Sequence, residues 1–175
     1  MSLPSVSSLN NQLLALPPTL SSHEGATQFV NVIADYINQV QAGPTGSPGI
    51  LTYTRPPAIA AIEALPPVID NSWIPNFAAA VHLGVTSGIL TPGTVTDPAW
   101  TASVVDVLPP VIITLPAALA VLTAGLAPVT SGNNPAMPMA QAIHDYALAF
   151  TFLCTGLALA LPAPPIPVPL PFPAQ

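Results

Sequence analysis

The side chains that could do chemistry are few and scattered along the 175-residue chain. Two histidines stand beside acids, as His23-Glu24 and His144-Asp145, and His82 stands alone in an apolar stretch. Neighbouring residues on a helix point to different faces, so neither pair is arranged to act on one group. Scattered histidines without a cluster of cysteines or carboxylates also lack metal-ligand spacing. We predict no catalytic residues, no metal site and no cofactor.

Two further reactive side chains have structural explanations. Cys154 is the single cysteine and stands in the apolar run FTFLCTGL, where a buried, unreactive thiol is expected. Arg55 precedes two prolines, and we expect it to form a salt bridge or a cap at an interface. The sequence has no nucleophile-elbow, phosphate-loop or dinucleotide-binding glycine motif. It therefore predicts a protein that is not an enzyme.

Charge is scarce throughout the chain. Charged residues are 5% of the sequence, against about 25% in ordinary globular proteins. There is one cation, Arg55, and the formal net charge is −6. Nucleic acid is excluded as a partner, because binding phosphates needs several Lys and Arg. Disorder is also disfavoured, because the chain is 51% hydrophobic. Sparse charge weakens the repulsion that keeps proteins apart, so we predict a subunit packed among other protein chains, including copies of itself.

Two apolar segments, 111–127 and 146–161, raise an alternative, a small membrane-associated protein. Both are shorter than the ~20 apolar residues that span a bilayer, and the first contains Pro116. Neither is flanked by Lys or Arg, which would set its orientation. Segments of this length are more typical of buried core helices, so a membrane partner is not the favoured interpretation.

Several segments are predicted to be helices. Ser21 and Glu24 have the spacing of a capping box and precede apolar residues at helical intervals, up to Gly43. Another helix is predicted from about Ile74, with Ser72 or Asp70 as its cap.

Two more helices are predicted in the second half of the chain. A short buried helix is expected to begin at Pro116. The last helix is predicted over 139–161, and its second half is apolar on all sides, which favours a neighbouring subunit around it.

An internal repeat lies between these helices. Residues 49–69 and 88–112 both open with Gly-Ile-Leu-Thr and close with Leu-Pro-Pro-Val-Ile. Each copy is predicted to hold a short helix between prolines, capped by Thr54 in the first and by Asp97 in the second. The repeat indicates a pseudo-duplicated helical unit.

The C-terminal segment 162–175 reads PAPPIPVPLPFPAQ. Alternating proline predicts a stiff, extended, polyproline-like arm that cannot be an inner strand of a sheet. A disordered tail is the simpler alternative, but the arm carries apolar residues suited to a groove on another subunit. The predicted partner interface comprises Pro165, Ile166, Val168, Leu170 and Phe172 of this arm, with Phe152 and Leu157 of the preceding segment.

The fold class is therefore predicted to be mainly α, with one helical domain over 1–161 and the arm over 162–175. Short Pro-Pro-bounded helices, turns such as TSGILTPGTV, little charge and the strap PIPVPLPFPAQ together resemble the accessory structural subunits of tailed-phage particles. The resemblance implies a virion component of the capsid, neck, tail or baseplate, assembled in the host cytoplasm. A secreted coat protein of low charge is a third interpretation.

Overall fold

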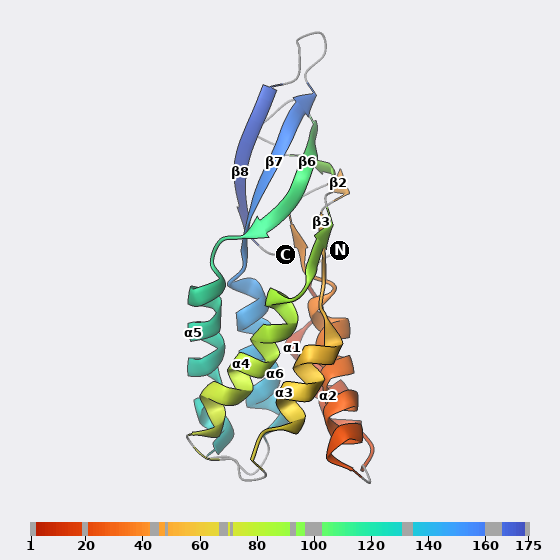
Figure 1. Ribbon diagram of the computed structural model, residues 1–175, viewed down its shortest axis with the longest axis vertical. Coiled ribbons are helices and arrows are strands. Elements are labelled where there is room, and N and C mark those ends of the chain that lie inside the picture. The colour runs from red at the N-terminus through yellow and green to blue at the C-terminus, as the bar shows by residue number, and fades with distance from the viewer. Residues whose placement is uncertain are drawn as a thin grey trace.

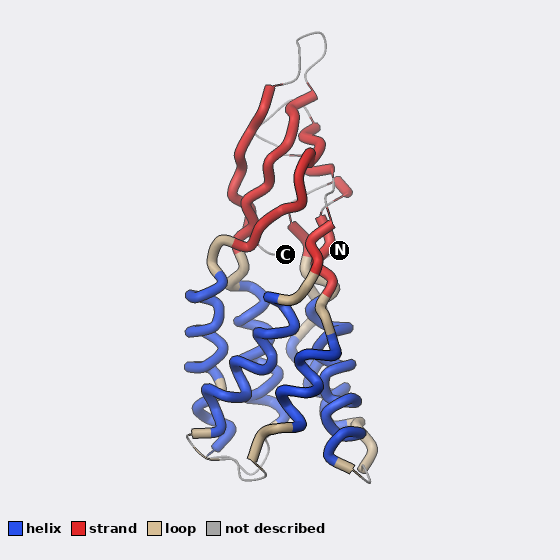
Figure 2. The backbone as a smooth tube through the Cα atoms, viewed as in Figure 1, coloured by secondary structure: helices blue, strands red, loops and turns tan. Residues whose placement is uncertain are grey.

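The molecule is elongated, with a bundle of helices at one end and β-sheets at the other (Figure 1, Figure 2). This computed structural model describes residues 3–18, 21–42, 46–47, 49–66, 70, 72–91, 94–96, 103–130, 135–159 and 166–173. The helices are α1 (Val6–Leu14), α2 (Ser22–Ile37), α3 (Arg55–Glu63), α4 (Trp73–Thr86), α5 (Leu115–Gly125) and α6 (Ala136–Leu148), with a 3-10 turn η1 (Ala127–Thr130). The strands are β1 (Gln41–Ala42), β2 (Gly46–Ser47), β3 (Gly49–Thr52), β4 (Ile89–Thr91), β5 (Thr94–Thr96), β6 (Ser103–Ile112), β7 (Thr151–Leu159) and β8 (Ile166–Pro173). The predicted mainly helical fold is confirmed, although sequence analysis did not anticipate the sheets.

One continuous hydrophobic core holds the bundle together. On α2, Val30, Ile33 and Ile37 recur at helical spacing and are fully buried. Each such side chain contributes about 1.5–3 kcal/mol by leaving water. On α4, Trp73 stacks on Phe77 with ring centroids 4.3 Å apart. Tertiary burial of this kind stabilises helices that are too short to persist alone.

Two helix starts follow their predicted caps. The Ser21 hydroxyl oxygen accepts the N–H of Glu24 at 3.1 Å, as the capping-box spacing predicted. At α4, Asp70 accepts the N–H of Trp73 at 3.0 Å. The Ser72 hydroxyl donates to the same carboxylate, and these two hydrogen bonds lower the pKa of Asp70. The helices predicted in both segments are confirmed, although α2 ends at Ile37 rather than at Gly43.

The predicted cap of α3 is wrong in its chemistry. The helix begins after Thr54, as expected, but the Thr54 side chain makes no cap hydrogen bond. Its hydroxyl instead donates to the backbone oxygen of Ser87 at 2.7 Å, at the end of α4. Thr54 therefore ties two helices together, and Pro56 in the first turn lacks the N–H that a cap would have satisfied.

The two Gly-Ile-Leu-Thr copies pair with each other. They form β3 and β4 of a three-stranded antiparallel sheet in the order β1-β3-β4. Leu51 lies opposite Leu90, and the exposed Ile50 and Ile89 lie on the other face. An approximate local twofold axis therefore relates the first residues of the two copies.

The helix predicted in the second copy is wrong over the part that the structure describes. Residues 103–112 form β6, the middle strand of a five-stranded antiparallel sheet in the order β2-β5-β6-β7-β8. Pro109 and Pro110 fall where the register with β7 shifts, between the pairs Leu108–Thr155 and Val111–Leu153. A bulge accommodates prolines in a strand because it interrupts the hydrogen-bond ladder. The predicted cap, Asp97, lies outside the described residues.

The long last helix is also wrong in its second half. Helix α6 ends at Leu148, and residues 151–159 form β7. The Thr114 hydroxyl fixes this change, because it donates to the oxygen of Ala149 at 2.8 Å and accepts the N–H of Thr151 at 2.9 Å. A continuous apolar run does not distinguish a buried helix from a buried strand, which is why the sequence misled here.

The apolar segments considered for a membrane are divided between elements of different kinds. Segment 111–127 spans the end of β6, α5 and the start of η1, and 146–161 spans the end of α6 and β7. Within the described ranges, none of the helices has both the length and the apolar character needed to cross a bilayer. The predicted short helix beginning near Pro116 is confirmed as α5.

Helix α4 and Tyr53 are packed without spare room. A methyl group added at Gly84 would lie 2.0 Å from Cζ of Tyr53, whose ring is buried. The Tyr53 hydroxyl donates to the backbone oxygen of Val81 at 2.9 Å, so the ring cannot move aside without breaking this bond. The absence of a side chain at Gly84 is therefore what allows β3 to approach α4.

We expect Gly84→Ala to destabilise the fold by about 1–3 kcal/mol, since overpacking outweighs the gain of about 1 kcal/mol in helix propensity. Chemical denaturation followed by circular dichroism measures this change. The control Thr86→Ala, exposed on the same helix, should stay within about 0.5 kcal/mol of the wild type. A Gly84→Ala protein as stable as the wild type would contradict the packing described here.

Candidate functional site

The five-stranded sheet projects beyond the helical bundle (Figure 1). The substantial contacts of β6, β7 and β8 in the described structure are with other strands and not with helices. Contacts of β6 with β3 and β4, and of β7 with β1, join this sheet to the small sheet at its base. The helices of the chain therefore cover the bundle core and not the projecting sheet.

The three long strands are apolar at successive positions. They read SVVDVLPPVI in β6, TFLCTGLAL in β7 and IPVPLPFP in β8, with Asp106 as their one charged residue. A strand with water on one face alternates polar and apolar residues, whereas an apolar run suits a strand covered on both faces. The apolar sequences of these strands are therefore typical of strands that are covered on both faces, whereas their substantial contacts in the described structure are not with helices.

Exposed hydrophobic side chains gather where the bundle meets the sheets. We call this set the junction band, and each member lies within five residues of a boundary between a helix and a strand. Ile89 is 67% exposed and Val111 is 57% exposed. The junction band comprises Ile50, Ile89, Val111, Ile113 and Leu148.

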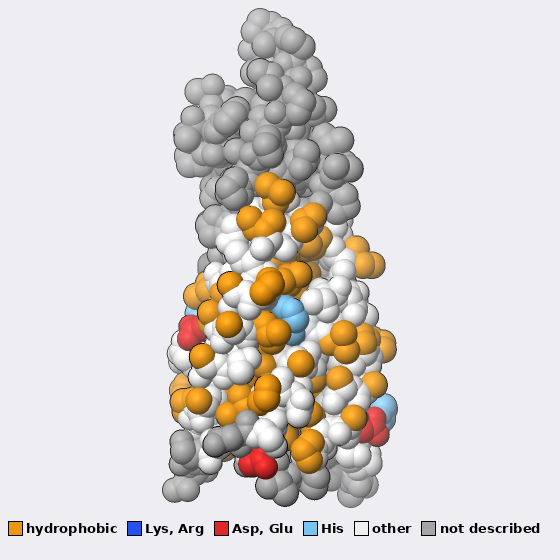
Figure 3. All heavy atoms as spheres, turned by 60° about the vertical axis from the view of Figure 1, so that its left-hand side comes forward, with side chains coloured by type: hydrophobic (Ala, Val, Ile, Leu, Met, Phe, Trp, Pro, Cys, Tyr) orange, Lys and Arg blue, Asp and Glu red, His pale blue; other side chains and the backbone are white. Residues whose placement is uncertain are grey.

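Hydrophobic side chains continue from this level down one side of the bundle. Figure 3 shows them across the face turned toward the viewer, with acidic side chains at its margins and a histidine near its middle. Leu83 of α4 and Val121 of α5 are also exposed hydrophobic residues of the bundle. Surfaces with so little charge and so much apolar area are typical of protein interaction sites.

The structure places most of the predicted interface residues on one ladder. The arm residues Ile166, Val168, Leu170 and Phe172 lie in β8, opposite Ala158, Gly156, Cys154 and Phe152 of β7. Leu157 of β7 lies between Val105 of β6 and Pro167 of β8. Pro165 lies outside the described residues, as does the side chain of Cys154.

Phe152 differs from the other predicted interface residues because its side chain is fully buried. Its ring lies 6.3 Å from that of Phe150, which in turn lies 4.8 Å from that of Tyr146. Phe152 therefore belongs to the core of its own chain, at the point where the bundle and the sheet join, and we leave it out of the exposed surface.

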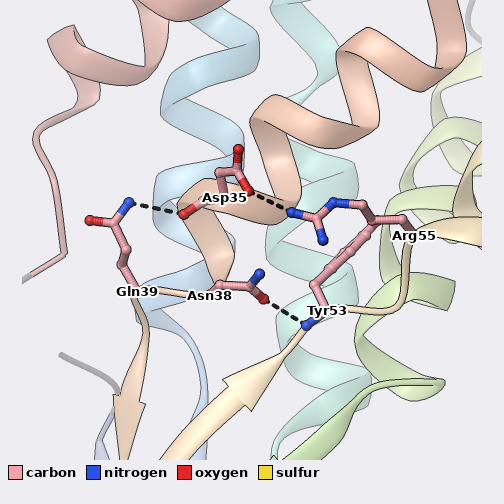
Figure 4. A network of polar contacts seen from close by, with 5 residues as sticks. All are labelled: Asp35, Asn38, Gln39, Tyr53 and Arg55. Atoms are coloured by element: carbon pink, nitrogen blue, oxygen red, sulfur yellow. Dashed lines mark hydrogen bonds and ion pairs between the residues drawn. The ribbon is translucent and has the colours of Figure 1, made fainter.

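A group of polar contacts fixes the approach of β3 to the helices (Figure 4). The Asn38 side-chain oxygen accepts the backbone N–H of Tyr53 at 2.7 Å. The guanidinium of Arg55 donates to Asp35 at 2.5 Å, so the expected salt bridge is formed within the chain, between α2 and the start of α3. The Gln39 amide donates to the backbone oxygen of Asp35 at 2.9 Å. The contacts of Asn38 and Arg55 link the end of α2 to the segment that leads into α3, and the contact of Gln39 lies within the end of α2. Their role is structural.

Buried tyrosines form contacts with histidines that the sequence did not predict. The Tyr146 hydroxyl lies 2.8 Å from Nδ1 of His82, and the Tyr36 hydroxyl contacts Nδ1 of His144. The Tyr36 hydroxyl donates to the oxygen of Pro4 at 2.8 Å, so it accepts from His144. The available signal is the repeated Asp-Tyr pair in IADYI and IHDYA, which is equally typical of the polar rim of an amphipathic helix.

Burial favours the neutral forms of these tyrosines and of His82. Burial raises the pKa of Tyr36 to about 12, with a further contribution from the charge of Asp145. Burial also raises the pKa values of Tyr53 and Tyr146, and desolvation lowers that of His82. The phenols are therefore neutral hydrogen-bond donors near pH 7, and His82 is neutral there too.

The remaining acid–histidine contact is on the surface. His23 pairs with Glu63 of α3 at 2.9 Å, rather than with its neighbour Glu24, and His23 and Glu63 are both exposed. In the part of the chain that the structure describes, no three His, Cys, Asp or Glu side chains are grouped to hold a metal ion. The candidate functional site is therefore an apolar surface made of the projecting sheet and the junction band.

Comparison with known proteins adds no relative. No protein-family model matches the sequence, and no curated protein and no solved structure shows significant similarity to it. The function has to be argued from the surface itself.

We expect Asn38→Ala to destabilise the fold by about 1–3 kcal/mol, because the half-buried N–H of Tyr53 loses its acceptor. Asn38→Asp retains an acceptor oxygen and should be milder. The control Arg55→Ala removes a largely exposed ion pair and should change the free energy of unfolding by about 0–1 kcal/mol. Equal effects of Asn38→Ala and Arg55→Ala in denaturant titrations would contradict this ranking.

We also expect His82 to make stability depend on pH. Because its pKa is lower in the folded state than in the unfolded state, the unfolded state binds the proton more readily. The contribution is complete above the unfolded pKa of about 6.5 and is lost as the pH falls below it. His82→Gln should therefore reduce the drop in Tm between about pH 7.5 and about pH 5.5. His23→Gln, at an exposed pair, serves as the control, and an undiminished drop in His82→Gln would refute the assignment.

Proposed function

We propose that the protein is a non-enzymatic structural subunit of a large protein assembly. The observation that carries the proposal is the projecting apolar sheet, whose long strands make their substantial contacts, within the described residues, with other strands and not with helices, together with the junction band at its base. Burying apolar surface contributes about 25 cal/mol per Å², so an uncovered apolar sheet favours association with other chains.

The scarcity of charge supports the same proposal. A formal charge of −6 comes from seven acids and one Arg, and the Arg is used within the chain by Asp35. Acids that repel a second copy are few, and in the long strands β6, β7 and β8 only Asp106 is charged. Apolar contacts with protein neighbours, including further copies, fit this surface better than contacts with nucleic acid.

The assembly that we propose is a virion, formed in the host cytoplasm, in which the chain occupies an accessory position of the capsid, neck, tail or baseplate. The scarcity of charged residues and the short segments bounded by prolines support this assignment. In this proposal the duplicated segments 49–69 and 88–112 provide two related units around the junction, and the paired Gly-Ile-Leu-Thr strands support that relation. The arm 162–175 provides an extended apolar strap.

The strap belongs to the proposed interface through its position on the sheet. Alternate residues of a strand share one face, so Ile166, Val168, Leu170 and Phe172 occupy one face of β8. Their cross-strand positions in β7 include Phe152, so the strap continues the face that begins at the bundle core. The exposed Val111 and Ile113 flank Ile112, which pairs with the buried Phe152, so these two residues of the junction band lie on the opposite face of the sheet. The proposed interface therefore includes both faces, with the strap on one and Val111 and Ile113 on the other.

We expect the purified chain to self-associate or to join its assembly, and the double variant Val111→Asp/Ile113→Asp to weaken this association at least tenfold. Both side chains are exposed in the single chain, so the substitutions should leave its fold intact and act on the interface. Light scattering coupled to size-exclusion chromatography measures the change, and circular dichroism checks the fold.

The matched control is Leu14→Asp/Met137→Asp, which changes exposed apolar residues of similar size. Met137 lies near the start of α6, whose other end leads into β7. Leu14 lies at the end of α1, where Leu13 and Leu16 line a pocket with Ala136 at the same end of the bundle. The control should associate like the wild type. A wild-type chain that stays monomeric at all concentrations and joins no particle would overturn the proposed function.

A further inference from the structure

The two hydrogen bonds of Thr151 fix which way each residue of β7 faces. The backbone oxygen of Thr151 accepts the N–H of Ile113 at 2.9 Å, and its N–H donates to the Thr114 hydroxyl at 2.9 Å. Both backbone groups of Thr151 therefore point toward the residues that directly follow β6, which is the side of β7 on which β6 lies. Because successive residues of a strand point their backbone groups to opposite sides, Phe152 and every second residue after it face β8.

The register of β8 matches this phase without a shift. Phe152 pairs with Phe172, Cys154 with Leu170, Gly156 with Val168 and Ala158 with Ile166. The prolines of β8 fall opposite the residues of β7 that face β6: Thr151, Leu153, Thr155 and Leu157. Each residue of β8 that faces β7 thus has an N–H to donate, and each residue that faces outward is a proline.

We infer that β8 is a one-sided strand, which pairs with β7 along its inner edge and blocks the addition of any further strand at its outer edge. Proline has no N–H, so the outer edge between Ile166 and Pro173 presents carbonyl acceptors only. A strand added there could donate its N–H groups to the proline carbonyls, but its own carbonyl oxygens would receive no donor from β8, so only half of the hydrogen bonds of a regular ladder would form. An unprotected edge strand of this length and hydrophobicity would instead be a template for aggregation.

The opposite edge of the same sheet is protected in another way. There the described terminal strand is β2, which has two residues, Gly46 and Ser47, paired with β5. Short edge strands offer few donors and acceptors to a second chain. Association of the sheet is therefore directed to its faces. This holds for any partner, so the inference goes beyond the proposed function and does not depend on it.

The decisive experiment restores donors on the outer edge alone. In the full-length chain, Pro169→Thr/Pro171→Thr adds two outward N–H groups and leaves every inward pair with β7 in place. We expect the weight-average mass to rise at least twofold over that of the wild type at the same concentration. Hydrogen exchange should show the new amides of residues 169 and 171 protected at least tenfold in the associated form.

The matched control, Val168→Thr/Leu170→Thr, introduces the same two threonines at inward positions. It adds no outward donor, so its edge should remain blocked and its mass should not exceed that of the wild type. Circular dichroism at the helical bands confirms that the bundle is folded in both variants, because the helices do not depend on β8.

The reverse change tests the inner edge. Leu170→Pro removes an inward N–H, and we expect it to release β8 and to speed hydrogen exchange at Cys154 and Gly156 at least tenfold. The inference is overturned if Pro169→Thr/Pro171→Thr keeps the mass of the wild type with freely exchanging amides at 169 and 171. It is also overturned if Leu170→Pro leaves exchange at Cys154 and Gly156 unchanged. Either result would mean that the prolines do not set the direction of pairing.

Discussion

The excess of apolar over charged side chains is the constraint on which the structure depends. In the bundle, the apolar faces of the helices pack into one core. At two helix starts, Ser21 and Asp70 accept hydrogen bonds from backbone N–H groups. The three long strands carry a similarly apolar sequence but rise beyond the helices that would cover them. The same composition therefore gives a self-sufficient bundle at one end and a surface suited to other chains at the other.

Half-buried polar side chains serve to position elements, and they do so at a few defined places. Thr114 ends α6 and starts β7 by bonding to both Ala149 and Thr151, and Asn38 holds the N–H of Tyr53 at the entrance to α3. In a protein with so little charge, neutral hydrogen bonds take the place that salt bridges often have. They are also short-range and directional, which suits joints between a helical layer and a sheet.

The sequence predicted the helices well where polar and apolar residues alternate at helical spacing, as in α2, or where a clear cap exists, as in α4. It failed where the residues are apolar on every side, since 151–159 has no periodicity to separate a strand from a helix. It failed again at Pro109-Pro110, because a proline pair that ends a helix in one copy of the repeat forms a bulge of a strand in the other. The apolar interface stays a proposal: composition predicted its character and its residues, and the register adds that Ile166, Val168, Leu170 and Phe172 pair with β7. The contacts of Tyr36 and Tyr146 with histidines join residues far apart in the sequence, so the local Asp-Tyr pairs could not reveal their partners.

The alternating prolines connect these observations. A sheet that is apolar on both faces and open at a long edge would combine two causes of uncontrolled aggregation, since faces and edges would both recruit other chains. Proline at every outward position of β8 removes the donors from that edge and keeps the four inward pairs with β7. Contacts through the faces depend on side-chain shape and can be specific, whereas contacts through edges depend on the backbone and accept almost any strand. Under the proposed function, such a chain binds its neighbours through side-chain contacts on the faces of the sheet, because the prolines leave the outer edge of β8 without donors for further strands.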